Sequence, residues 1–167
     1  GRGDSTLRLP KGASAGVVTF SHKGSSNVSL QVLDARNQST GDLLVNDIGS
    51  YSGVTAYGLS DLGGDPVKLK ISADGSWNIK IAPISTAPRL GSSASGKGDR
   101  VFRYDGDAVD FAITHKGSAN FVVMQAGGAF PNLAVNEIGS YRGTVPFEEG
   151  PSVVTITADG TWTLKRQ

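Results

Sequence analysis

The chain has 167 residues, 38% of them hydrophobic, and its 16 Lys and Arg residues almost balance its 15 Asp and Glu residues. It holds no basic run and no long apolar run, so we expect neither a nucleic-acid-binding surface nor direct membrane insertion. The lack of cysteine excludes disulfide bonds and cysteine-bound zinc. The chain begins with glycine, which we interpret as the start of a processed or excised piece of a longer protein.

Most of the sequence occurs twice. Four segments recur in the same order: residues 1–4 and 96–99, 22–27 and 115–120, 43–51 and 133–141, and 72–77 and 157–162. Internal repetition on this scale predicts two copies of one structural unit. We expect a first unit over residues 1–82 and a second over residues 96–167. Between them, residues 83–95 are rich in proline and serine and predict a linker.

Apolar and polar residues alternate in short runs, which is the pattern of half-buried β-strands. In the first unit, residues 18–22, 28–32 and 77–81 show this alternation. The same parity places Trp77 and Trp162 in the core, because each shares its side of the strand with aliphatic residues.

Two Asp-Gly pairs, Asp74-Gly75 and Asp159-Gly160, lie between alternating runs. Asp-Gly is a preferred centre of the type I′ turn, in which both central residues have positive φ, so each pair predicts a β-hairpin. We count about six to eight short strands per unit and no amphipathic helix. The sequence therefore predicts an all-β protein of two tandem antiparallel β-sandwich modules, Ig-like or jelly-roll-like.

The chemistry-bearing residues do not predict a catalytic centre. His22 and His115, the only histidines, occupy equivalent positions, and no further ligands stand around them at metal-binding spacing. We expect each imidazole at a strand end, bonded to a loop backbone. Nothing resembles the nucleophile elbow of a Ser-His-Asp hydrolase. We therefore expect no enzymatic activity and no cofactor.

One group of acidic residues and one tripeptide each allow a functional interpretation beside a structural one. Asp105, Asp107 and Asp110 could bind calcium through carboxylate oxygens, but the first copy has no acidic residues at the aligned positions, which favours a solvated loop. Arg2-Gly3-Asp4 spells the integrin-recognition tripeptide. Its counterpart reads Lys97-Gly98-Asp99, which favours turn chemistry over adhesion.

The longest nearly identical run covers residues 46–51 and 136–141. A structural role suits it, since asparagine bonds its own turn, isoleucine fills the core, glycine takes a strained turn conformation and tyrosine bonds back to the backbone. The alternative is a binding surface, in which a flat aromatic ring beside amide and acid groups holds a sugar ring or a peptide. The predicted ligand-binding residues are Asn46, Asp47, Tyr51, Asn136, Glu137, Tyr141 and Arg142.

Taken in order, the repeated pieces read His-x-Gly-x-x-Asn, then Leu-Leu-Val-Asn-x-Ile-Gly-x-Tyr-x-Gly, then Ala-Asp-Gly-x-Trp, and they cover most of each copy. This pattern resembles a poorly characterised β-sandwich repeat module of secreted and surface-exposed bacterial proteins. The resemblance implies an extracellular or cell-surface location in bacteria and an accessory part of a larger protein. It carries no established catalytic residues.

We therefore expect a non-catalytic, extracellular accessory module for binding or adhesion, with a polysaccharide or a partner protein as its ligand. Two copies on one chain add avidity if both bind, because the second contact becomes intramolecular. The alternative is a structural spacer or sensor ectodomain attached to a larger secreted or membrane-anchored protein. A binding module should place unburied aromatic side chains from both copies on a concave or flat shared surface, whereas a spacer should have its tyrosines and tryptophans buried and a featureless surface.

Overall fold

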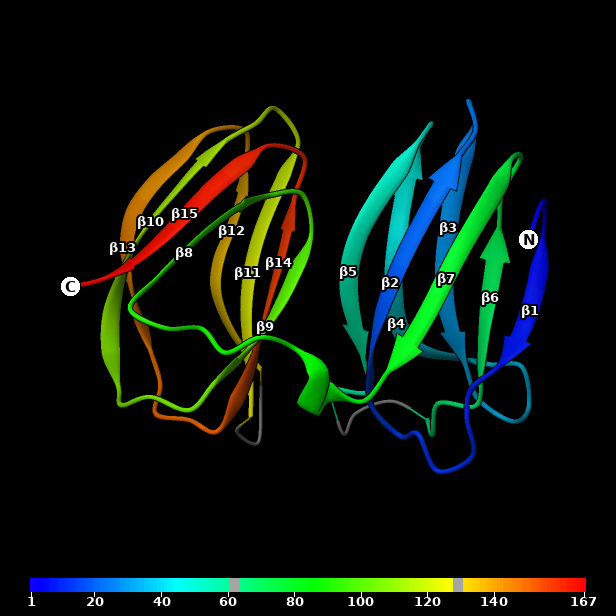
Figure 1. Ribbon diagram of the computed structural model, residues 1–167, viewed down its shortest axis with the longest axis horizontal. Coiled ribbons are helices and arrows are strands. Elements are labelled where there is room, and N and C mark those ends of the chain that lie inside the picture. The colour runs from blue at the N-terminus through cyan, green and yellow to red at the C-terminus, as the bar shows by residue number, and fades with distance from the viewer. Residues whose placement is uncertain (61–63, 128–130) are drawn as a thin grey trace. The chain divides into compact units, whose positions relative to one another are not determined.

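The protein folds as two compact units, Gly1–Thr86 and Ala87–Gln167. The computed structural model describes residues 1–60, 64–127 and 131–167. Each unit is a sandwich of two antiparallel sheets (Figure 1), which confirms the predicted all-β fold. In the described ranges the only helix is a single 3₁₀ turn, η1 (Ile84–Thr86). None of the described helical structure has the length or the hydropathy to cross a bilayer.

Unit 1 contains seven strands among its described residues. They are β1 (Ser5–Arg8), β2 (Gly16–Lys23), β3 (Asn27–Leu33), β4 (Ser39–Ile48), β5 (Tyr51–Tyr57), β6 (Lys68–Ser72) and β7 (Ser76–Ala82). One sheet has the order β1-β6-β3-β4 and the other the order β5-β2-β7. Consecutive strands therefore often lie in opposite sheets, and their turns gather at the ends of the sandwich.

Unit 2 contains eight strands among its described residues. They are β8 (Ser93–Lys97), β9 (Arg100–Tyr104), β10 (Val109–Lys116), β11 (Asn120–Ala126), β12 (Asn132–Ile138), β13 (Tyr141–Phe147), β14 (Ser152–Ala158) and β15 (Thr161–Arg166). The sheets have the orders β13-β10-β15-β8 and β12-β11-β14-β9, which is the strand order of a jelly roll. Unit 1 has the same order without a counterpart of β8 among its described strands.

The Asp-Gly pairs join strands of different sheets, so the predicted hairpins are wrong. Asp74-Gly75 leads from β6 in one sheet to β7 in the other, and Asp159-Gly160 leads likewise from β14 to β15. Neither glycine has the positive φ of a type I′ turn. Glycine is needed for another reason, because a Cβ at Gly75 would lie 1.9 Å from the carbonyl oxygen of Lys23. The pair packs one inter-sheet turn against another.

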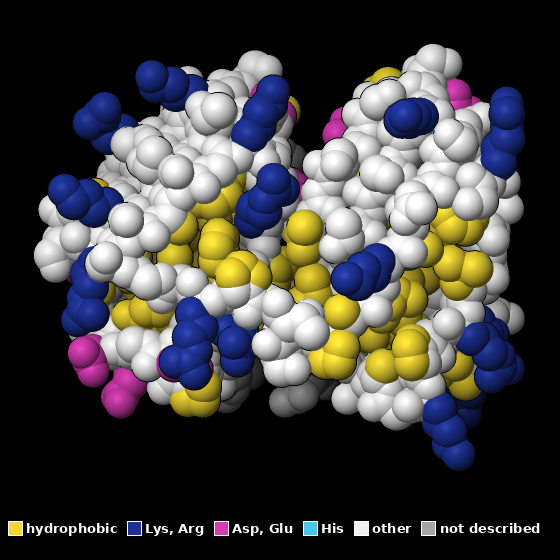
Figure 2. All heavy atoms as spheres, in the orientation of Figure 1, with side chains coloured by type: hydrophobic (Ala, Val, Ile, Leu, Met, Phe, Trp, Pro, Cys, Tyr) yellow, Lys and Arg dark blue, Asp and Glu magenta, His cyan; other side chains and the backbone are white. Residues whose placement is uncertain are grey.

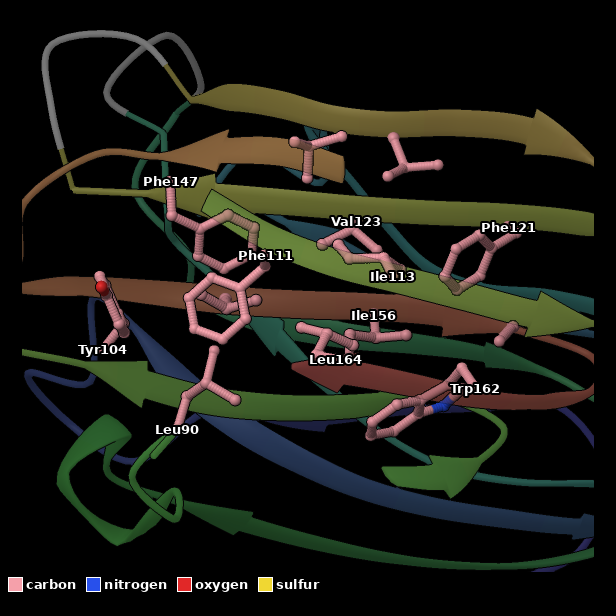
Figure 3. Close-up of a cluster of buried hydrophobic side chains, with 14 residues drawn as sticks. Leu90, Tyr104, Phe111, Ile113, Phe121, Val123, Phe147, Ile156, Trp162 and Leu164 are labelled. Atoms are coloured by element: carbon pink, nitrogen blue, oxygen red, sulfur yellow. The ribbon is translucent and has the colours of Figure 1, made fainter. Parts of the chain in front are cut away.

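Alternate residues of each strand fill the space between the two sheets, as the sequence periodicity predicts. In unit 2, Phe111, Phe147 and Tyr104 gather near one end of the core (Figure 3), and the ring centroids of the two phenylalanines are 4.6 Å apart. Trp162 is 1% exposed, which confirms its predicted place in the core, whereas Trp77 is only partly buried. Burial of each such large side chain contributes about 1.5–3 kcal/mol.

The segment predicted as a linker, residues 83–95, is shared between the units. Residues 83–86 close unit 1 with the η1 turn, and the chain belongs to unit 2 from Ala87 onward. Leu90 is buried in the core of unit 2, and β8 begins at Ser93. The proline and serine content hides the membership of residues 87–95 in unit 2, because Leu90 is the only large apolar residue among them.

Candidate binding site

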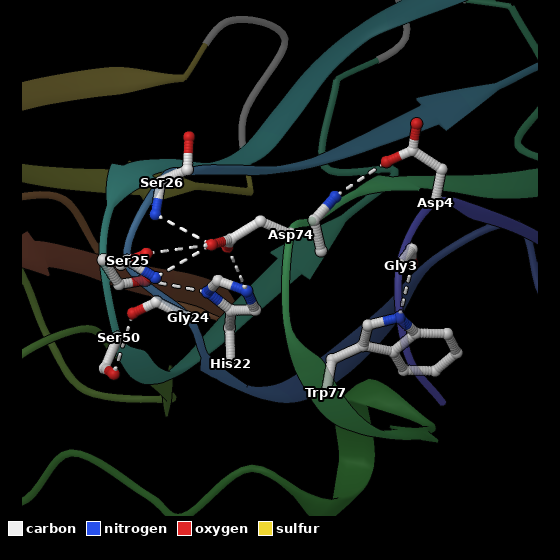
Figure 4. Close-up of polar contacts among 11 residues, drawn as sticks. Gly3, Asp4, His22, Gly24, Ser25, Ser26, Ser50, Asp74 and Trp77 are labelled. Atoms are coloured by element: carbon white, nitrogen blue, oxygen red, sulfur yellow. Dashed lines mark hydrogen bonds and ion pairs between the residues drawn. The ribbon is translucent and has the colours of Figure 1, made fainter.

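A histidine near the end of β2 ties together the turns at one end of unit 1 (Figure 4). His22 is 1% exposed, and its Nδ1 lies 2.7 Å from the carbonyl oxygen of Gly49, in the β4–β5 turn. A carbonyl oxygen only accepts hydrogen bonds, so Nδ1 carries a proton. Nε2 lies 3.2 Å from Oδ1 of Asp74, in the β6–β7 turn. The imidazole thus connects two inter-sheet turns, as its strand-end position predicts.

Asp74 caps a third turn, between β2 and β3. Its Oδ2 accepts hydrogen bonds from the backbone N–H groups of Ser25 (3.0 Å) and Ser26 (3.1 Å). The Ser25 N–H lowers the pKa of the Asp74 carboxyl most; partial desolvation opposes this, and the Ser26 N–H lowers the pKa further. The carboxylate is therefore charged at neutral pH and holds the turn closed.

Unit 2 repeats this cluster with equivalent partners. Nδ1 of His115 lies 2.7 Å from the carbonyl oxygen of Gly139, and its Nε2 lies 3.4 Å from Oδ1 of Asp159. The backbone N–H of Ser118 donates to Asp159 (2.8 Å) and is the main cause of the lowered pKa of that carboxyl. The ring of His115 also stacks on Phe121 at a centroid distance of 4.3 Å. The His and Asp of both motifs therefore support the fold.

The Gly-x-Gly-Asp motif forms hydrogen bonds to both sides of the β6–β7 turn. The carbonyl oxygen of Gly3 accepts from Nε1 of Trp77 (2.8 Å), and Oδ1 of Asp4 accepts from the N–H of Ala73 (2.9 Å), as Figure 4 shows. Gly3 has a φ of 70°, as expected of a glycine in this turn. The same two bonds recur in unit 2 at 2.9 and 2.8 Å. The aspartate of the tripeptide is thus a structural acceptor, which supports the turn interpretation over adhesion.

The predicted ligand residues of unit 1 are divided between its two sheets. Asn46 and Asp47 are exposed near the end of β4, an edge strand that pairs with β3. Tyr51 begins β5 in the other sheet, and its partly buried ring lies 6.1 Å from the ring of Phe20, centroid to centroid. The amide and acid groups therefore face solvent, while the tyrosine ring packs against the core.

The predicted ligand residues of unit 2 are divided in the same way. Asn136 and Glu137 are exposed near the end of the edge strand β12. Tyr141 begins β13 and packs against the core, with its ring centroid 5.9 Å from that of Phe121. Arg142 follows it on β13 and is exposed. The amide and acid groups are thus presented by β12, whereas the tyrosine and the arginine are presented by β13.

Ile48 and Ile138 are exposed, so the expectation that they fill the core is wrong. Their exposed fractions are 77% and 78%. Ile48 stands opposite Asn27 of β3, and Asn46 stands opposite Ser29, which places both on the outer face of the sheet. We name the residues of this face the β4 strip (Leu43, Asn46 and Ile48) and, in unit 2, the β12 strip (Leu133, Asn136 and Ile138). The two leucines are 55% and 53% exposed.

A β-bulge hides the exposure of Leu43 from sequence alternation. Val45 and Leu43 stand opposite consecutive residues of β3, so Leu44 is the extra residue of the bulge. Val45 points into the core, and Ile48, three residues on, points outward. In sequence, these apolar residues look like one buried run. The only local signal for exposure is that Ile48 shares its parity with the polar Asn46.

The structure does not gather the acidic residues considered for calcium. Asp105 lies 3.4 Å from Nε of Arg89, and Asp107 lies 3.4 Å from Nη2 of Arg166. Asp110 is on β10, where its carbonyl oxygen accepts from the N–H of Gln167. Within the described part of the chain, no three acidic or histidine side chains converge as a metal site.

Comparison with known proteins adds no function to this geometry. No known family model matches the chain, and no curated protein matches it. The functional argument therefore rests on the residues that both units repeat. Some of them hold the turns together, and others are exposed.

Proposed function

We propose that this protein is a non-catalytic binding module that holds a partner protein through the β4 strip and the β12 strip. The observation that carries the proposal is that Ile48 and Ile138 are present in both copies although both are largely exposed. A large apolar side chain on the surface promotes association. Its occurrence at the same exposed position in both units supports a role in binding rather than in folding.

The chemistry of the strips favours a protein over a polysaccharide. Each strip combines two aliphatic side chains with one amide on an edge strand. Sugar binding relies on flat aromatic faces, but Tyr51 and Tyr141 pack against the phenylalanines of their cores. An edge strand also offers backbone N–H and C=O groups for pairing with a partner strand.

The bacterial, extracytoplasmic setting of this function is part of the proposal. It is supported by the resemblance of the repeated motifs to modules of secreted and surface-exposed bacterial proteins. Two equivalent strips on one chain suit such a setting, because weak contacts to a crowded surface gain avidity when the second contact is intramolecular.

The test compares the full chain with the variant Ile48→Ser/Ile138→Ser for binding to surface-protein and cell-wall polysaccharide fractions of bacteria. Burial of each isoleucine contributes about 1.5–3 kcal/mol, so the variant should bind the protein fraction at least about tenfold more weakly. The matched control is Lys80→Ser/Lys165→Ser, which changes equivalent exposed residues on β7 and β15 and should bind as the native chain does.

The outcomes separate the possible functions. Binding that disappears after protease treatment of the fraction, and in the isoleucine variant alone, supports the proposal. Binding to polysaccharide that survives protease treatment shows a glycan ligand and contradicts it. Absence of binding to both fractions indicates a structural spacer. Circular dichroism of each variant confirms that it is folded.

A further inference from the structure

The sheet that contains the β4 strip carries a group of positive charges on its outer face. Arg8 of β1 stands directly opposite Lys68 of β6, and Lys70 lies two residues further along the same side of β6. Residues directly opposite each other have Cβ atoms about 4.5–5.5 Å apart, and diagonal neighbours are about 7–8 Å apart. We name these three residues the basic patch. They are far apart in the sequence, so strand pairing alone brings them together.

The basic patch has no acidic partner within residues 1–60, 64–127 and 131–167. None of its side chains forms an ion pair there. Nζ of Lys68 donates instead to the amide oxygen of Asn37 (2.6 Å). Asp34, in the same turn as Asn37, uses Oδ1 to accept from the N–H groups of Arg36 and Gln38. Like charges directly opposite each other destabilise a sheet, so an acidic group bound over the patch would relieve this cost.

The basic patch and the β4 strip belong to one continuous surface. A single row of outward side chains crosses the strands in the order β1, β6, β3 and β4: Thr6, Lys70, Gln31 and Leu43. Neighbouring strands lie about 4.8 Å apart, so the backbones of Lys70 and Leu43 are about 10 Å from each other. A partner that covers Leu43 and extends over the face of the sheet therefore meets the positive charges.

Unit 2 has no such patch beside its β12 strip. The equivalent row across β9, β14, β11 and β12 consists of Val101, Thr155, Met124 and Leu133. Val153 and Thr155 replace the two lysines. Arg103 replaces Arg8, and its Nε donates to the carbonyl oxygen of Ala87 (3.0 Å). The two strips thus border surfaces of different character, and the positive charge belongs to unit 1.

We propose that the partner held by the β4 strip is an acidic protein segment, whose Asp or Glu side chains lie over the basic patch. This inference rests on the function proposed for the strips and names the chemistry of the partner. Leu43 and Ile48 contact apolar side chains of the segment, and the amide of Gln31 hydrogen-bonds to it between the two regions. Complementary charges mainly select the partner and fix its register.

The first test titrates poly-L-glutamate into the full chain at low salt and follows backbone amides by NMR. Chemical-shift changes should centre on Gln31, Lys68 and Lys70. The equivalent amides of unit 2, Met124, Val153 and Thr155, are internal controls and should not change, because no lysine lies beside them on the outer face of β14. Raising the salt concentration from about 0.05 M to about 0.5 M should weaken binding at least about tenfold, because salt screens exposed charges.

Matched charge reversals locate the site. Lys68→Glu/Lys70→Glu should weaken binding of poly-L-glutamate at least about tenfold. The control Lys23→Glu/Lys80→Glu makes the same change of charge on the outer face of the other sheet, and it should bind within about twofold of the native chain. Figure 2 views unit 1 from the side of β2 and β7, where single Lys or Arg side chains stand apart.

Equal losses in the two variants, or shift changes spread evenly over all lysines, show general attraction between charges and overturn the inference. The second test repeats the comparison with the bacterial surface-protein fraction. Loss of binding in the isoleucine variant but not in Lys68→Glu/Lys70→Glu overturns the acidic partner and leaves the strips as the binding site. Loss in the lysine variant but not in the isoleucine variant supports an acidic partner and contradicts the strips. Loss in neither variant contradicts both. Circular dichroism confirms that each variant is folded.

Discussion

At the scale of single residues, the repeated motifs separate into groups that hold the fold and groups that remain on its surface. His22, Asp74 and Asp4 each bond to turns that are distant in sequence, and their counterparts in unit 2 do the same. Asn46 and Ile48 are equally repeated but exposed. The residue types were visible in the sequence. Their partners were not, because these contacts form only when the two sheets stack.

The variant Asp74→Asn/Asp159→Asn tests the capping role of the two carboxylates. Their pKa values in the folded protein lie below 3.8, the ordinary value of an aspartate carboxyl, so the two carboxylates stabilise the fold above that pH. This stabilisation is lost as the pH falls through the lower, folded pKa. The native chain should therefore be more stable than the variant at about pH 7, and the difference should shrink towards about pH 3.

Urea midpoints of both proteins, measured at neutral and acidic pH, decide this prediction. A difference between native chain and variant that is the same at both pH values would show that the charge of the caps does not matter. Circular dichroism at neutral pH should show the same strand content in both proteins.

At the scale of strands, alternation predicted where strands lie but not how they pair. The Asp-Gly pairs were expected to close hairpins, yet β6 and β7 lie in different sheets. The preference of Asp-Gly for a hairpin turn did not decide the structure here. The packing of the β6–β7 turn against the carbonyl oxygen of Lys23 did. The exposure of Leu43 is hidden for a similar reason, since the bulge at Leu44 depends on the register with β3.

Two pairs of substitutions on β4 and β12 separate the core from the exposed strips. Ile48→Thr/Ile138→Thr should change the free energy of unfolding by less than about 0.5 kcal/mol per site, because both side chains are exposed. Val45→Ala/Val135→Ala should cost about 1–3 kcal/mol per site, because both valines are buried. Chemical denaturation of the four single variants provides the measurement. A large loss of stability at either isoleucine would assign the strips to folding rather than to binding.

At the scale of the whole molecule, the two units share one jelly-roll strand order. Unit 2 has β8 on the edge of its sheet, and the described strands of unit 1 include no counterpart of it. The prediction of a linker at residues 83–95 hid β8, because most of this strand lies inside that segment. A segment rich in serine and proline looks like a linker until its backbone is seen paired with β15.

Two fragments test where unit 2 begins. The fragment of residues 87–167 should fold by itself, because it contains a complete sandwich with its own core. The fragment of residues 96–167, cut at the predicted boundary, lacks Leu90 and most of β8. It should be less stable by at least about 2–5 kcal/mol, since Leu90 is buried and β8 covers β15. Urea denaturation followed by the fluorescence of Trp162 measures both, and equal stability would contradict the boundary at Ala87.

The sequence by itself determined that the chain is a repeat of β-strands. Repetition and alternation are local properties, written in residue order and independent of any partner. Only the tertiary structure decided which strands share a sheet, which turns the His and Asp residues hold together, and which repeated residues face solvent. These depend on pairing between strands far apart in the chain and on a bulge set by that pairing. Leu43 therefore shares its parity in the sequence with the buried Val45 and yet lies on the surface of the folded protein.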